Sequence, residues 1–111
     1  MYGINKIILV GHLGTDPDIS RLNDIISVNF PFVTSETIYK NGEQTETTEW
    51  HNIVMSSRTA ENAIRSLRKG SLVYLEGKAR ARSFNDTEGL KKRLTEIEIY
   101  KFQILDRKSD I

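Results

Sequence analysis

The pair Asn41-Gly42 stands between two segments, residues 25–36 and 45–56, in which apolar and polar side chains alternate. Alternation with a period of two places successive side chains on opposite faces of a β-strand. The Asn-Gly pair favours the positive backbone angles of a tight turn. The sequence therefore predicts two antiparallel strands joined by this turn, each burying one face. Pro31 in the first strand indicates a sheet edge or a bulge.

The second of these strands contains the single tryptophan of the chain, Trp50. Period two places Trp50 and Asn52 on the face opposite to Ile53 and Met55, which are typical core residues. A large ring among polar neighbours has two interpretations. It is either buried in the core or at a subunit contact, or it is an exposed surface on which a ligand stacks.

Three further segments have the character of strands. Residues 5–13 are apolar on both faces, which calls for cover on both sides and favours self-association. Residues 71–84 and 91–100 alternate with a period of two, and the Asn- and Gly-containing residues 85–89 predict a turn between them.

One segment has helical periodicity. Ala60, Ala63, Ile64 and Leu67 fall at positions i, i+3, i+4 and i+7. The following Lys69-Gly70 predicts a basic last turn and a glycine stop.

The predicted order is three strands, a short helix and two strands. This order indicates an all-β fold, a five-stranded oligonucleotide/oligosaccharide-binding (OB-fold) barrel with one short α-helix between strands 3 and 4. Element order alone leaves another small barrel open. A chain of 111 residues forms one domain, here residues 1–105, followed by a short C-terminal end at residues 106–111.

Composition excludes several classes of protein. The chain contains no cysteine, no long apolar run and no signal-peptide pattern, which predicts a cytoplasmic protein without disulfides or membrane association. The formal net charge is only +1, a weak argument for a polyanionic partner. The distribution of the charges must decide that question.

The most informative charges share one strand face, on which Lys78, Arg80 and Arg82 are followed by Phe84. Cations about 6.5 Å apart match the spacing of an extended phosphate backbone. Basic side chains also occur on solvated strand faces, where they discourage aggregation. Together with Trp50, however, the row favours single-stranded nucleic acid, because rings stack on any base and cations follow the strand without reading sequence.

Catalysis has little support in the sequence. His12 and His51 lack metal-ligand spacing, and no cysteine is present to complete a zinc site. Asp16, Asp18 and Asp24 are more typical of turns and helix caps than of a catalytic centre. We predict no enzyme activity, no metal site and no cofactor.

Three segments also match a known pattern in order: residues 4–17, residues 44–51 with their Thr-Glu-Trp-His sequence, and residues 67–77 followed by Arg80 and Arg82. Over about residues 3–105 the chain resembles the bacterial-type single-stranded DNA-binding proteins (the SSB family). The resemblance implies a barrel that binds single-stranded DNA without sequence preference in replication, recombination and repair. It further implies a homo-oligomer, with a tetramer favoured over a dimer, that is cytoplasmic and associated with the nucleoid.

The resemblance also implies roles for individual residues. Base stacking falls to Trp50 and Phe84, and phosphate contact to Lys6, Arg58, Arg68, Lys69, Arg80 and Arg82. Three positions depart from the family pattern, because Ile38 and Ser56 stand where rings are frequent and Asn52 stands where arginine is frequent. Because two stacking positions are lost, we expect weaker binding or a shorter binding site, unless Tyr39 substitutes for the ring missing at its neighbour.

Members of the family typically continue into an acidic tail that recruits replication proteins, whereas residues 106–111 contain no such tail. Recruitment of replication proteins is therefore left open. Two alternatives remain at this point. One is a tail-less dimer that resembles the primosomal replication-restart protein, and the other is an oligomerising protein-interaction module with Trp50 buried at a subunit contact.

Overall fold

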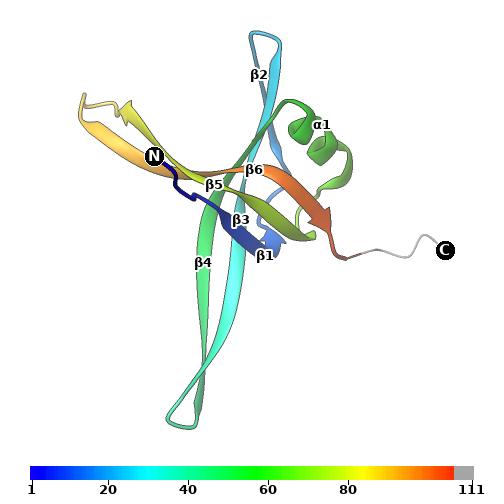
Figure 1. The fold of residues 1–111 in the computed structure, drawn as a ribbon, viewed down its shortest axis with the longest axis vertical. Coiled ribbons are helices and arrows are strands. Elements are labelled where there is room, and N and C mark those ends of the chain that lie inside the picture. The colour runs from blue at the N-terminus through cyan, green and yellow to red at the C-terminus, as the bar shows by residue number, and fades with distance from the viewer. Residues whose placement is uncertain (107–111) are drawn as a thin grey trace, which may run out of the picture.

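The computed structural model describes residues 1–106, and residues 107–111 of the predicted C-terminal end lie outside this range. It contains six strands: β1 (Ile7–Leu13), β2 (Asp18–Leu22), β3 (Ile25–Lys40), β4 (Glu43–Ser56), β5 (Leu72–Asn85) and β6 (Lys91–Ile104). One helix, α1 (Ser57–Ser66), lies between β4 and β5. Hairpin arms formed by β3–β4 and by β5–β6 project away from the central sheet (Figure 1).

Pairing between β1 and β3 closes the sheet into a barrel. The strand order is β1-β5-β6-β4-β3-β2, and β1 additionally pairs with β3 through His12↔Val33 and Leu13↔Phe32. Five strands therefore form a closed ring, which confirms the predicted OB-type barrel. The helix α1 follows β4, which is the third strand of the ring, as predicted. Because the unpredicted strand β2 lies outside the ring, β4 is the fourth strand along the chain.

The sequence missed β2 because this strand has no buried face. All five of its residues are exposed, and its apolar residues Ile19 and Leu22 are three positions apart. Its pairing with β3, from Asp18↔Asn29 to Leu22↔Ile25, depends on backbone hydrogen bonds rather than on burial.

The predicted alternation does define the core. Ile26, Val28, Phe30 and Phe32 of β3 are buried, and so are Ile53 and Met55 of the facing strand. The helix α1 packs against β3, β4 and β6. The buried side chains of this helical region are Ala60, Ala63 and Leu67, each with 0% exposure.

Two turn residues have the geometry that the sequence predicted. Asn41 and Gly42 have φ angles of 53° and 80°, as the tight β3–β4 turn requires.

Pro31 lies where β3 changes partners, between Asn29, which is the last β3 residue paired with β2, and Phe32, which is the first paired with β1. Proline lacks an N–H donor, so it fits where β3 changes partners and forms a local edge.

The helix ends earlier than predicted. Its last residue is Ser66, and Leu67 has extended backbone angles (φ −97°, ψ 139°). Leu67 leaves the helix with its side chain fully buried, and the N–H of Gly70 then bonds the carbonyl of Leu13 at 2.9 Å.

Within residues 1–106 no helix is long and apolar enough to cross a lipid bilayer.

Closure of the barrel predicts a low tolerance for bulk at Gly11 of β1. A Cβ there would overlap the carbonyl oxygen of Val33 and lie 3.1 Å from Cε2 of Phe32. We expect Gly11→Ala to lower the free energy of unfolding by about 1–3 kcal/mol, measured by urea denaturation. Gly3→Ala is the control, because a Cβ at Gly3 meets nothing within 4 Å. Equal midpoints for the two variants would contradict the close β1–β3 approach.

Candidate nucleic-acid interface

Trp50 lies on the outer face of the barrel. It pairs with Val33 across the β3–β4 hairpin, and its side chain is 62% exposed while Ile53 and Met55 fill the interior. The ring rests on Gly14, since a Cβ on that residue would lie 2.7 Å from Cζ3 of the indole. Burial of Trp50 in the core of its own chain is therefore excluded, and one ring surface remains available.

A groove of about 250 Å³ lies beside the strand that carries Trp50. The strands β4 and β6 are parallel neighbours only at Ile53↔Ile97 and Val54↔Glu98, so they diverge on either side of this short contact. Four strands line the groove with Asn29, Phe30, Pro31, Asn52, Ile53, Val54, Arg82, Leu94 and Glu96. Because Asn52 is two residues from Trp50 on the same face of β4, Trp50 and Arg82 belong to one surface.

The predicted cation row lies on the outer face of β5, with side chains that are half-exposed to mostly exposed. Each cation is paired with a glutamate of the neighbouring strand β6. Arg80 Nη1 lies 2.5 Å from Glu98 Oε2, and Lys78 Nζ lies 3.7 Å from Glu98 Oε1. Arg82 Nε lies 3.6 Å from Glu96 Oε1.

Sequence reasoning had not paired these carboxylates with the row. Glu96 and Glu98 alternate with the core residues Ile97 and Ile99, so their outward direction was predictable. Their partners depend on the β5–β6 register, in which Arg80 is opposite Glu96. That register is set by the five-residue connection between Asn85 and Lys91, and it is uniform from this turn to Gly77.

Phe84 extends the row onto the β5–β6 arm. Its side chain is 44% exposed and opposite Lys92, on the same face as Arg80 and Arg82. Asp86 shapes the tip of the arm, because its Oδ1 accepts hydrogen bonds from the N–H groups of Glu88 and Leu90 at 2.9 and 2.8 Å.

Lys6 joins the near end of the same row. The side chain of Asn5 continues the β1–β5 ladder, donating to the carbonyl of Ala79 at 2.8 Å and accepting from its N–H at 3.1 Å. This places Lys6 against β5, where its Nζ lies 3.8 Å from Glu76 Oε1.

The remaining predicted cations lie around α1 and do not line the groove. Arg58 is exposed on the first turn of the helix. Arg68 donates from Nη1 to the carbonyls of Ile64 and Leu67 at 2.9 and 2.7 Å, and the N–H of Lys69 bonds Asp16 Oδ1 at 2.7 Å. Arg68 and Lys69 both line a separate hollow of about 500 Å³.

The positions with missing rings are also separated from Trp50. Tyr39 and Ile38, 73% and 46% exposed, lie near the tip of the β3–β4 arm. Tyr39 is six positions from Val33, the partner of Trp50, which amounts to about 20 Å along a strand. Tyr39 is therefore a separate exposed ring rather than part of the Trp50 surface.

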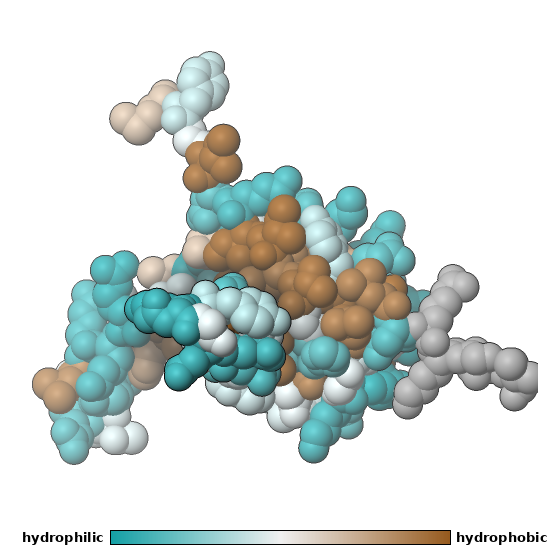
Figure 2. All heavy atoms as spheres, turned by 90° about the horizontal axis from the view of Figure 1, so that it is seen from below, coloured by the Kyte–Doolittle hydropathy of each residue, from teal (hydrophilic) through white to brown (hydrophobic). Residues whose placement is uncertain are grey.

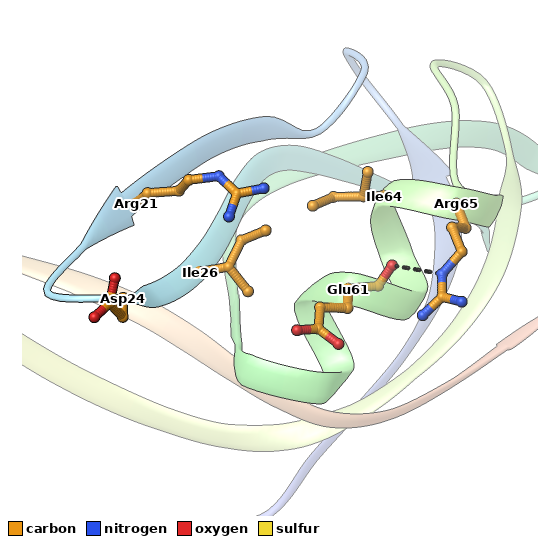
Figure 3. Close-up of a pocket in the computed structure, with 6 residues that line it drawn as sticks. All are labelled: Arg21, Asp24, Ile26, Glu61, Ile64 and Arg65. Atoms are coloured by element: carbon orange, nitrogen blue, oxygen red, sulfur yellow. Dashed lines mark hydrogen bonds between the residues drawn. The ribbon is translucent and has the colours of Figure 1, made fainter.

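A further hollow, of about 340 Å³, lies between the β2–β3 hairpin and α1. Figure 3 shows its lining, in which the backbone carbonyl of Glu61 accepts a hydrogen bond from Nε of Arg65. It shares no lining residue with the groove beside Trp50. Within residues 1–106, no three histidine or acidic side chains converge as metal ligands would.

The outer face of β1 is apolar and uncovered. Ile8 and Val10 are 53% and 50% exposed, and hydrophobic residues gather on one face of the barrel in Figure 2. Among the described residues 1–106, residues 7–11 of β1 pair only with β5, and their other edge has no strand beside it in that range. Beside them the Tyr74 hydroxyl donates to Glu76 Oε1 at 2.9 Å, and this hydrogen bond, with some burial and the glutamate charge, raises the pKa of Tyr74.

The sequence is similar to known proteins over nearly its whole length. The model of the "Single-strand binding protein family" matches residues 4–105. A "Single-stranded DNA-binding protein" of Neisseria meningitidis serogroup A is 38% identical over 109 residues, which cover 96% of this chain and 63% of the relative. A protein of the same name from Bacteroides thetaiotaomicron is 41% identical over 109 residues, covering 95% of this chain and 68% of the relative. The chain thus spans less than two thirds of the length of the Neisseria relative.

The fold has a similarly close match among solved structures. A chain of the structure described as "Plasmodium falciparum SSB complex with ssDNA" aligns with a TM-score of 0.87 and 31% sequence identity. The alignment covers 96% of this chain and 98% of that chain. Sequence and fold agree over the same residues, and the chain belongs to the single-strand binding protein family.

Proposed function

We propose that this protein binds single-stranded DNA without regard to sequence and protects it during replication, recombination and repair. The observation that carries the proposal is the exposed Trp50 ring beside a groove that Arg82 helps to line. The Plasmodium falciparum chain with the same fold was solved in complex with single-stranded DNA, which supports the same ligand for this chain.

Stacking on exposed rings selects unpaired bases. In a duplex the base faces are covered by their neighbours, whereas an unpaired base can lie flat on the indole of Trp50 or the ring of Phe84. The cations Lys6, Lys78, Arg80 and Arg82 would follow the phosphates between these rings. Such interactions depend on base surface and backbone charge, so they are independent of sequence.

The path of the strand can extend beyond the groove. Arg58, Arg68 and Lys69 would continue the phosphate contacts around α1, and Tyr39 would offer a further stacking surface on the β3–β4 arm. The role is that of a binding protein rather than a catalyst, in line with the relatives, which carry the name of DNA-binding proteins.

We also propose that the protein assembles as a homo-oligomer, a tetramer or a dimer, through β1. Ile8 and Val10 form an exposed apolar face, and no strand of the part of the chain that the structure describes pairs with the adjoining edge. Burial of apolar side chains and strand pairing at a free edge both favour association with a second copy.

The first test uses Trp50 as a fluorophore, because it is the only tryptophan. A thymidine oligomer should quench its emission through stacking, whereas a duplex of equal length should quench it far less. Trp50→Ala should weaken binding by about 1–3 kcal/mol, measured by anisotropy of a labelled oligomer. Tyr2→Ala is the control, since Tyr2 is a fully exposed ring outside the groove. Unchanged emission at saturating DNA would favour the protein-interaction alternative.

The second test concerns phosphate contact. Arg80→Gln should flatten the dependence of log K on log salt by at most about 0.7, the slope for one phosphate contact on a single strand. The measurement is a series of anisotropy titrations at increasing salt. Arg65→Gln removes the same charge from the hollow beside α1 and should leave the slope unchanged. Parallel slopes for Arg80→Gln and the parent would reject Arg80 as a phosphate ligand.

The third test concerns assembly. Ile8→Lys places a charge on the apolar face of β1, so it should reduce the particle mass measured by light scattering. Ile19→Lys is the matched control, because Ile19 is 51% exposed on β2 and Ile8 is 53% exposed. A parent that already scatters as a monomer, or an Ile8→Lys particle of parental mass, would show that β1 is not the subunit contact. A two-subunit parent would favour the restart-protein alternative.

A further inference from the structure

The cations proposed to contact phosphate already have anionic partners in the free protein. Lys78 and Arg80 share Glu98, and Arg82 is paired with Glu96. The cation side chains are 48–64% exposed, whereas the two glutamates are only 20–29% exposed. The carboxylates are therefore more deeply buried than the cations with which they pair.

In these pairs the arginine side chains reach along β6 toward the barrel. Arg80 is opposite Glu96 in the β5–β6 register, yet its Nη1 bonds Glu98, two residues nearer to the barrel. Arg82 is opposite Leu94 and reaches Glu96 in the same way. Glu96 also lines the groove, and Glu98 pairs with Val54 at its border. Arg82 and Glu96 thus line the groove itself, and Glu98 holds Lys78 and Arg80 at its border.

We infer that Glu96 and Glu98 compete with DNA phosphates for the cations of β5, so that binding depends on base stacking rather than on backbone charge. This inference rests on the proposed single-stranded DNA binding and specifies how its ligand is selected. A polyanion without bases only replaces the carboxylates of Glu96 and Glu98 with its own anionic groups as partners of the cations. A strand with bases adds stacking on Trp50 and Phe84, which the carboxylates do not oppose.

The competition has a thermodynamic signature in the salt dependence. A free cation that binds phosphate releases a counterion from the strand. A cation that first leaves a carboxylate also leaves that carboxylate exposed to phosphate, and the carboxylate then takes up a counterion of its own. The net release is smaller, so the paired row should give a shallower salt slope than an unpaired one.

The experiment compares the full chain with Glu98→Gln and with Glu96→Gln, each nearly identical in shape to the parent. Anisotropy titrations use a thymidine oligomer and an abasic oligomer of the same length across a salt series. Glu98→Gln should bind the thymidine oligomer about two- to five-fold more tightly at low salt, as expected for exposed ion pairs. Its slope should be steeper by about 0.7 for each additional phosphate that the cations neutralise. The abasic oligomer should gain affinity by a similar factor, because the carboxylates act on the phosphate contacts that both oligomers make.

Glu61→Gln controls for net charge, since Glu61 lines the hollow beside α1 and not the groove. It should change neither the slope nor the affinity for either oligomer, and thermal unfolding confirms that each variant is folded. If the parent binds the thymidine oligomer and the Glu96 and Glu98 variants match it, the carboxylates do not compete with phosphate and the inference is wrong. Weaker binding by these variants would overturn it too, since it would mean that the carboxylates align the cations. A parent that binds no oligomer would instead overturn the proposed function itself.

Discussion

Closure of the barrel by β1 is the constraint on which the rest of the structure depends. β1 pairs with β5 over residues 7–12 and with β3 at His12 and Leu13. A closed ring gives each of its strands an inner face, and period-two alternation then fixes which side chains remain outside. Because Ile53 and Met55 fill the interior, Trp50 must face outward.

The same constraint explains how much of the fold the sequence predicts. Where one face is buried, apolar residues mark it, so β3, β4 and the barrel part of β5 were predicted from alternation, and Asn41-Gly42 placed their first turn correctly. Where both faces are exposed, this signal disappears. The strand β2 and residues 37–40 of β3 are held by backbone pairing alone, and both escaped the prediction.

In the candidate site, likewise, the sequence predicts what alternation within one strand determines and does not predict contacts between strands. The outward direction of Trp50 and of the row that ends at Phe84 follows from alternation within one strand, which the sequence contains. The ion pairs of that row follow from the register between β5 and β6 and from side chains that reach two residues along the neighbouring strand. Contact between distant strands is a property of the folded chain, so the roles of Glu96 and Glu98 became visible only in the structure.

These ion pairs have opposite consequences in the free and the bound protein. Neighbouring cations about 6.5 Å apart along a strand repel each other by about 0.6 kcal/mol even in water. An exposed ion pair contributes about 0–1 kcal/mol, so Glu96 and Glu98 offset this repulsion and stabilise the free β5–β6 hairpin. Phosphates would offset the same repulsion in the complex, where the carboxylates become like-charged neighbours of the strand. Glu96 and Glu98 therefore stabilise the free sheet and at the same time lower its affinity for backbone charge. Stacking on the exposed rings involves no charge, so it is unaffected by this conflict.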